Sequence, residues 1–160
     1  MLGKEHVMAS INVGRVVAGG LVAGVVANAI DFVTNTYILA SDMAAWAPTR
    51  NLDPAAMNSG PVAATWMVVD FIMGLLLVFT YAAMRPRLGA GPKTAILAGL
   101  ALWFAVTVVL FGFTQMGVFS MALFVKGSIA ALINTLAASV AGAAVYKEEA
   151  PAAGASYARA

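Results

Sequence analysis

The chain has 160 residues, of which 62% are hydrophobic and only 10% are charged, whereas about a quarter of the residues in a soluble domain are charged. These charged side chains are too few to cover a water-soluble globule, so we expect the excess apolar surface to face lipid. The absence of cysteine excludes disulfides, thiol nucleophiles and the common cysteine-containing zinc sites. A net charge of +2 gives no argument for nucleic-acid binding.

Four apolar segments predict an all-α, membrane-embedded four-helix bundle, formed by a single domain that covers residues 1–146. Each segment is long enough to cross a hydrocarbon core of about 30 Å, which takes about 20 helical residues. The apolar stretch after residue 94 is too long for one helix, and Thr114-Gln115-Met116-Gly117 is its best break. The expected helices cover about 16–40, 62–84, 94–116 and 118–146, and the tail 147–160 is expected to be mobile.

The first segment has one competing interpretation, a cleaved secretory signal peptide. Lys4 and Arg15 precede an apolar stretch at 16–26, and Ala27-Asn28-Ala29 matches a small-residue cleavage site. Because the apolar run continues past that site to residue 39, a retained first helix fits the sequence better.

The distribution of basic residues predicts the orientation in the membrane. With four spans, Arg50 alone falls on one side, and the other side carries Lys4, Arg15, Arg85, Arg87, Lys93, Lys147 and Arg159. The positive-inside rule then places both termini in the cytoplasm (N-in, C-in). We interpret the short inner loop with Arg85, Arg87 and Lys93 as a topology signal that also meets anionic lipid headgroups.

The longer loop, 41–60, is expected to face outward. Asp53 is expected to cap a short helix that begins at Pro54, because aspartate is a preferred N-cap residue and proline fits the first helical position. Trp46 is expected to anchor the loop at the membrane interface.

Three ionisable residues lie inside the predicted spans: Asp31, Asp70 and Lys126. Each lies about 12 Å from the outer end of its helix by helical rise. A charge in the bilayer interior costs roughly 2.5–3.5 kcal/mol, so such residues normally face the bundle and pair. We expect Lys126 to lie between the two acids in a buried charge cluster. Two interpretations stay open: a structural cluster that fixes helix order, and a proton or cation site coupled to transport.

A stripe of small and polar residues follows one face of the first helix: Gly20, Gly24, Asn28, Asp31 and Asn35. Asn134 lies on a similar stripe of the last helix, which also carries Lys126. The two stripes predict a polar packing seam where the first and last helices meet. Gly20 and Gly24 also form a GxxxG match, which serves packing within the monomer or dimerisation.

No cofactor or metal site is predicted. His6 is the only histidine. Methionine thioethers can bind copper, but no M-x-M or M-x-x-x-M cluster joins the methionines of the outer half and outer loops: Met43, Met57, Met67, Met116 and Met121. Asp31 and Asp70 have no nucleophile, metal or cofactor signature beside them, so an enzyme is the least favoured class. The leading interpretation is a non-catalytic accessory subunit or oligomer that acts through helix contacts, in a homo-oligomer or a larger membrane complex. The alternative is a small proton- or cation-linked transporter.

Residues 19–28 and 81–94, with the inner-loop pattern RPRxGxGPKTA, resemble those of small bacterial four-span membrane proteins without an assigned function. The resemblance covers nearly the whole chain. It implies a multi-pass protein of the bacterial inner membrane and implies no activity. Small multidrug transporters also have four spans, but they carry a glutamate in the first helix and have much shorter loops, so Asp31 is only a loose analogue of that glutamate.

Overall fold

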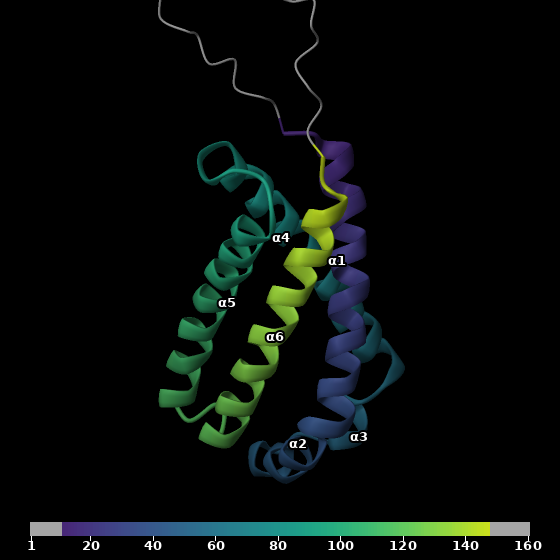
Figure 1. Cartoon of the computed structure of the whole chain (residues 1–160). Helices are drawn as coiled ribbons and strands as arrows, with labels where there is room; N and C mark the ends of the chain where they lie inside the picture. Colours follow the sequence, from purple (N-terminus) through teal and green to yellow (C-terminus); the bar gives the residue numbers. More distant parts are fainter. Residues whose placement is uncertain (1–10, 148–160) are drawn as a thin grey trace, which may run out of the picture.

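Figure 1 shows the protein as a computed structural model that describes residues 11–147. The described part is helical and contains no strand. Its elements are α1 (Val13–Val33), η1 (Thr34–Ile38), α2 (Ala40–Trp46), η2 (Ala47–Arg50), α3 (Pro54–Met57), α4 (Gly60–Leu88), α5 (Pro92–Gln115) and α6 (Met121–Val145). Four segments are long and apolar enough to cross a membrane: Val13–Ile38, Gly60–Leu88, Pro92–Gln115 and Met121–Val145. The all-α class with four candidate spans is therefore confirmed.

The two ends of the structure differ in what they carry. One end, which we call the terminal end, carries both ends of the described chain and the α4–α5 loop (Figure 1). The opposite end, which we call the distal end, carries α2, α3 and the α5–α6 loop. Lys4, His6, Arg159 and the predicted mobile tail from 148 onward lie outside the described residues.

The first span ends in a π-helical turn instead of the regular helix expected to residue 40. The Asn12 side chain caps its start by accepting a hydrogen bond of 3.0 Å from the Arg15 N–H. At the other end, Leu39 N–H donates to the Thr34 carbonyl at 2.9 Å, five residues back, which is the wider π-helical spacing. The helix then restarts as α2, so part of the expected outer loop is helical.

The α4–α5 turn is shorter than the sequence suggested, because α4 ends later and α5 begins earlier than expected. Pro86 lies inside α4, which continues to Leu88 and stops at Gly89, whose φ of 83° favours glycine. The helix was expected to stop at residue 84, but a proline in a last turn removes only one backbone hydrogen bond there. Pro92 opens α5 in its first turn, where its missing N–H is tolerated.

The long apolar stretch after residue 94 breaks at the polar segment that the sequence singled out. α5 ends at Gln115, and Gly117 has a left-handed φ of 76°. Ser120 then caps α6 by accepting a hydrogen bond of 3.2 Å from the Leu123 N–H. In the 41–60 loop, the Asp53 carboxylate accepts a hydrogen bond of 2.9 Å from the Ala55 N–H, and Pro54 opens α3, which confirms the predicted cap.

Glycines allow α1 to contact α4 and α6 backbone to backbone. A Cβ added at Gly74 of α4 would lie 2.5 Å from the Gly20 carbonyl oxygen and 2.6 Å from the Gly24 nitrogen. A Cβ at Gly19 would lie 2.7 Å from the Gly142 carbonyl oxygen of α6. These distances are too short for any side chain, so only glycine permits such close approach.

The buried core lies in the half of the structure near the terminal end. Leu77, Val78 and Tyr81 of α4 are almost completely buried there, together with small residues of the other helices: Ala23, Ala95, Ala98 and Ala138. Ser139 of α6 ties α5 to this core, because its hydroxyl donates a hydrogen bond of 2.7 Å to the Ala95 carbonyl.

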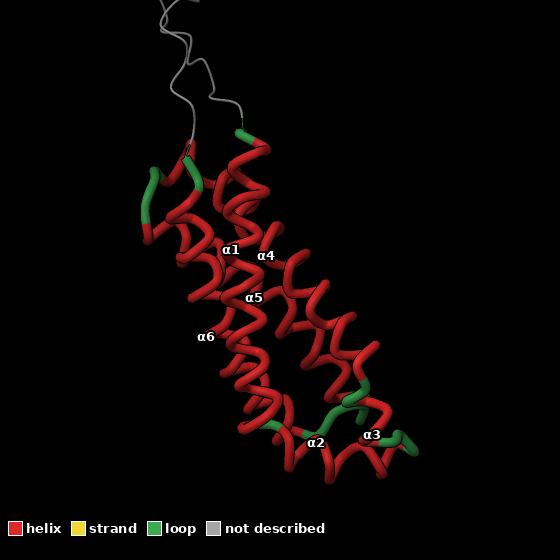
Figure 2. Tube along the Cα trace, turned by 90° about the vertical axis from the view of Figure 1, so that its right-hand side faces the viewer, coloured by secondary structure: helices red, strands yellow, loops and turns green. Residues whose placement is uncertain are grey.

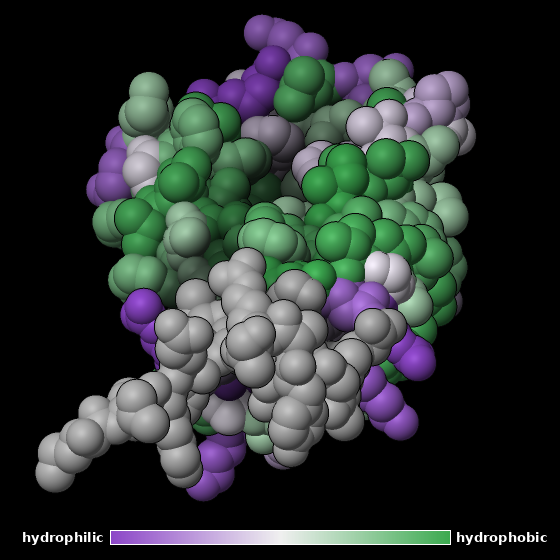
Figure 3. Space-filling view, turned by 90° about the horizontal axis from the view of Figure 1, so that it is seen from above, coloured by the Kyte–Doolittle hydropathy of each residue, from purple (hydrophilic) through white to green (hydrophobic). Residues whose placement is uncertain are grey.

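The half near the distal end is much more open. Every residue of α4 from Gly60 to Val68 is exposed except Val62, which is partly buried, and Trp66 is 65% exposed. Figure 2 shows this part of α4 leaning away from α1 toward α3. Exposed apolar side chains such as Trp66 are what a helix in lipid presents. Figure 3 looks onto the terminal end, where apolar groups lie on the visible face and hydrophilic groups lie around its edge.

Candidate functional site

Three polar side chains from three helices meet between α1, α4 and α6. The Asn134 amide donates a hydrogen bond of 2.5 Å to Oδ1 of Asp31. The carboxyl groups of Asp31 and Asp70 face each other closely enough to share a hydrogen bond when one of them carries a proton. Asp70 and Asn134 are buried, and Asp31 is partly buried. We call these three residues the carboxyl-pair site.

Helical spacing positions the carboxyl-pair site. Asn28, one turn before Asp31, donates hydrogen bonds to the Gly24 carbonyl at 2.9 Å and across to the Met67 carbonyl of α4 at 3.3 Å. Asn35, one turn after Asp31, donates to the Asp31 carbonyl at 2.9 Å. The π-helical turn begins at Thr34, so the regular part of α1 ends at Val33, shortly beyond Asp31.

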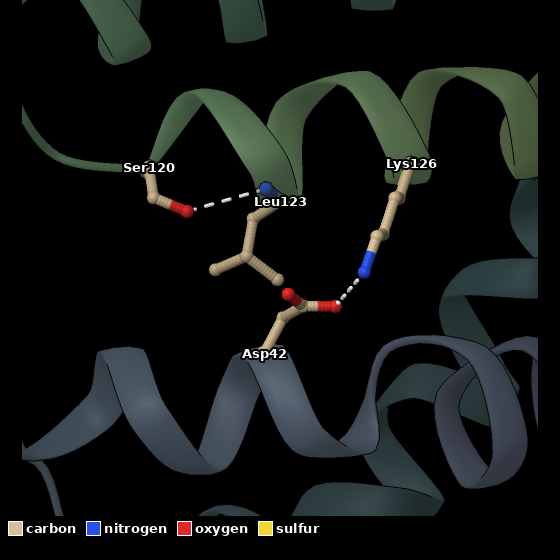
Figure 4. A network of polar contacts seen from close by, with 4 residues as sticks. All are labelled: Asp42, Ser120, Leu123 and Lys126. Carbon is tan, nitrogen blue, oxygen red and sulfur yellow. Dashed lines mark hydrogen bonds and ion pairs between the residues drawn. The ribbon is translucent and has the colours of Figure 1, made fainter.

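The expectation that Lys126 lies between Asp31 and Asp70 is corrected by the structure. Lys126 Nζ lies 2.6 Å from Oδ2 of Asp42, a residue of α2 (Figure 4). The two side chains point toward each other from α6 and α2, and they are 49% and 22% exposed. The predicted buried three-residue charge cluster therefore does not form, because α2 folds back over the start of α6 and brings in its own acid.

The carboxyl-pair site thus holds two acids without a basic partner among the described residues. Two carboxylates in contact repel each other strongly in a medium of low dielectric constant. A shared proton or a bound cation removes that repulsion, and the Asn134 amide stabilises the remaining negative charge on Asp31. The arrangement is therefore able to bind a proton or a small cation.

The predicted packing seam is divided between two helix pairs. Gly20 and Gly24 pack against α4, through Gly74, so the GxxxG match serves packing within the chain. α1 does contact α6, as the two stripes predicted, and Asn134 makes that contact polar by also donating to the Ala27 carbonyl at 3.4 Å. Asn28 faces α4, and Asn35 is exposed.

A second set of contacts fastens α2 and η2 to the α5–α6 loop at the distal end. The Trp46 indole N–H donates to the Val118 carbonyl at 3.0 Å, and its ring lies 5.6 Å from the ring of Phe119. The Arg50 guanidinium donates to the Gly117 carbonyl. Together with the ion pair between Asp42 and Lys126, these contacts form what we call the distal clamp. Trp46 was expected only as an interfacial anchor.

Two shallow depressions of the surface at the distal end lie along the distal clamp. One, of about 320 Å³, is lined by Asp42, Ala45, Trp46, Thr49, Arg50 and Ser120. The other, of about 250 Å³, is lined by Trp46, Arg50, Leu52, Met116, Gly117 and Val118. Neither includes a residue of the carboxyl-pair site.

The inner-loop residues lie together at the terminal end. Arg87 and Lys93 are exposed, while the Arg85 guanidinium lies 5.7 Å from the ring centroid of Tyr146, a cation–π contact. Tyr146 in turn packs edge-on against Tyr81, with ring centroids 5.9 Å apart. Neither tyrosine was predicted as a contact residue from the sequence, although aromatic residues near the ends of two spans are a signal for such a role.

The described residues contain no group of three or more histidine, cysteine, aspartate or glutamate side chains that could hold a metal ion. No match to this chain is found among protein-family models, curated proteins or solved structures.

Proposed function

We propose that this protein is a four-helix bundle of the bacterial inner membrane that exchanges protons for small cations at the carboxyl-pair site. The observation that carries the proposal is the meeting of Asp31 and Asp70 inside two apolar helices without a basic partner among the described residues. Intramembrane acids are costly and commonly mark proton or ion pathways. Exchange follows because a proton and a cation compete to neutralise the same pair of carboxyl groups.

The proposed orientation places the terminal end in the cytoplasm. Basic residues support it, because Arg15, Arg85, Arg87 and Lys93 belong to the terminal end, whereas Arg50 belongs to the distal end. Lys126, also near the distal end, is paired with Asp42. In this orientation Arg85, Arg87 and Lys93 lie at the level of anionic lipid headgroups, and the open half of the structure faces outward.

Vesicles that contain the purified protein test the exchange directly. With Na⁺ or K⁺ inside and a pH-sensitive dye enclosed, dilution into cation-free buffer should drive proton uptake as the cation leaves. The Asp31→Asn, Asp70→Asn double variant should reduce this flux to that of protein-free vesicles, because amides bind neither ion in exchange. Asp42→Asn, which removes an acid outside the site, should retain the flux. Equal flux in the double variant and the wild type would refute the proposal.

A second candidate function is the non-catalytic accessory subunit or oligomer. It is favoured by the exposed small-residue face of α5, where Ala101, Ala105 and Gly112 recur at helical spacing and a Cβ at Gly112 would meet nothing within 4 Å. If this function is right, purification in mild detergent should recover a partner in fixed stoichiometry, either a larger membrane protein or a second copy of this chain. Recovery of the chain alone as a monomer would contradict it.

A further inference from the structure

The distal half of the structure consists of two parts that are fastened very unequally. The larger part contains the distal ends of α1, α5 and α6, the α5–α6 loop, α2 and η2. The other part is the stretch of α4 from Gly60 to Asp70, which we call the α4 arm. All the contacts of the distal clamp lie within the larger part.

The larger part is also cross-linked between its helices. Asn134 binds Asp31 and so joins α6 to α1. The Trp103 indole N–H donates to the Ser128 carbonyl at 2.9 Å and joins α5 to α6, and the rings of Phe111 and Phe124 lie 5.5 Å apart along the same pair of helices. These contacts hold α1, α2, α5 and α6 together at the distal end.

The α4 arm has far weaker attachments. Within the described residues, only two polar contacts link its side chains or backbone to another element. One is the hydrogen bond of 3.3 Å from Asn28 to the Met67 carbonyl, and the other is the pair formed by Asp31 and Asp70. Most of the arm is exposed, whereas α4 beyond Gly74 is held by glycine contacts and by the buried core.

We propose that the α4 arm is a gate and that the contact between Asp31 and Asp70 is its closing contact. When the pair shares a proton, a hydrogen bond joins the arm to α1. When the proton is lost and no cation replaces it, two adjacent negative charges push the arm away from α1. Asp31 stays in place because Asn134 holds it, so Asp70 is the acid that moves.

The charges around the pair leave this repulsion uncompensated. From α6, Asn134 is neutral and Lys126 is paired with Asp42 of α2. α5 carries no charged residue after Lys93, which lies at its terminal end. α1 and α4 contribute only Asp31 and Asp70 near the site, because their other charged residues, Arg15, Arg85 and Arg87, lie at the terminal end. Opening of the arm would admit water and cations to the pair from the distal side.

Spin labels on single cysteines test the gate, because the natural chain contains no cysteine. In one variant the two labels are placed at Ala63 on the arm and at Met121 at the start of α6. In the control variant they are placed at Ala44 on α2 and at the same Met121. All three side chains are exposed. A bend of about 20° at Gly74 would move Ala63, about 16 Å away along the helix, by about 6 Å.

Distances are measured in lipid vesicles at about pH 5 and about pH 9, on either side of the neutral range. The arm pair should lengthen by about 6 Å at the higher pH, while the control pair should not change. In Asp70→Asn the arm should stay closed at both values, because an amide keeps the hydrogen bond to Asp31 without the charge. The unchanged control pair in each variant shows that the fold is retained.

The gate rests on the proposed proton site, and the two fail in different ways. If the arm distance does not depend on pH while vesicles still exchange protons for cations, the gate is wrong and the exchange function stands. An arm that opens equally in Asp70→Asn and in the wild type would also overturn the gate, because its motion would then not depend on the pair. Loss of exchange with a normally moving arm would refute the transport function alone.

Discussion

Replacing Gly74 with valine is expected to destabilise the folded protein by about 3 kcal/mol, at the upper end of overpacking effects. The first added carbon would lie 2.5 Å from the Gly20 carbonyl oxygen and 2.6 Å from the Gly24 nitrogen. Both contacts are backbone atoms, so no side chain can rotate to make room and α1 must separate from α4. Thermal or denaturant unfolding in detergent, monitored by the helical circular dichroism signal, measures the loss.

The same substitution at Gly112 is the matched control for this prediction. Gly112 also lies within a long apolar helix, but a Cβ added there would meet nothing within 4 Å. We expect Gly112→Val to change the free energy of unfolding by less than about 0.5 kcal/mol, as surface substitutions usually do. Equal stabilities of the two variants would mean that α1 and α4 do not make the glycine contact.

Much of the fold could be predicted because a membrane helix is encoded by the length of its apolar segment. The four candidate spans follow from that rule, and the turn between α5 and α6 follows from the polar residues near Gly117. Helix ends were less predictable. Pro86 was expected to end α4, yet a proline in a last turn disturbs little, and the π-helical turn at Thr34 has no distinctive sequence signal.

The candidate site was only partly predictable, for a reason of geometry. Depth along the helices identified Asp31 and Asp70 as neighbours, since acids at equal depth in adjacent helices can meet. The partner of Lys126 depended instead on α2, a short helix that was not expected in the first part of the outer loop. The sequence alone therefore gave no reason to pair Asp42 with Lys126. Asn134 was placed on the contact face of its helix, but the rotamer that directs its amide to Asp31 depends on packing.

The stability of the wild-type protein is expected to fall as the pH rises through the neutral range. Free aspartate side chains titrate near pH 4, so at neutral pH the unfolded chain has no proton on Asp31 or Asp70, whereas the folded pair is proposed to keep one. Because the folded state then binds more protons than the unfolded state, raising the pH favours unfolding. One proton corresponds to a slope of about −1.4 kcal/mol per pH unit in the free energy of unfolding, for as long as the folded pair keeps its proton.

Asp70→Asn should remove that slope, because its amide donates a hydrogen bond to the Asp31 carboxylate and no proton is taken up on folding. The variant should therefore match the wild type at acidic pH and become the more stable protein as the pH rises. Asp42→Asn alters only the partly exposed ion pair with Lys126, which typically contributes less than about 1 kcal/mol, so its curve should run parallel to that of the wild type. Unfolding measured at a series of pH values separates these cases. Parallel curves for Asp70→Asn and the wild type would show that the two carboxyl groups do not share a proton, and the site would then lose the property on which both exchange and gating depend.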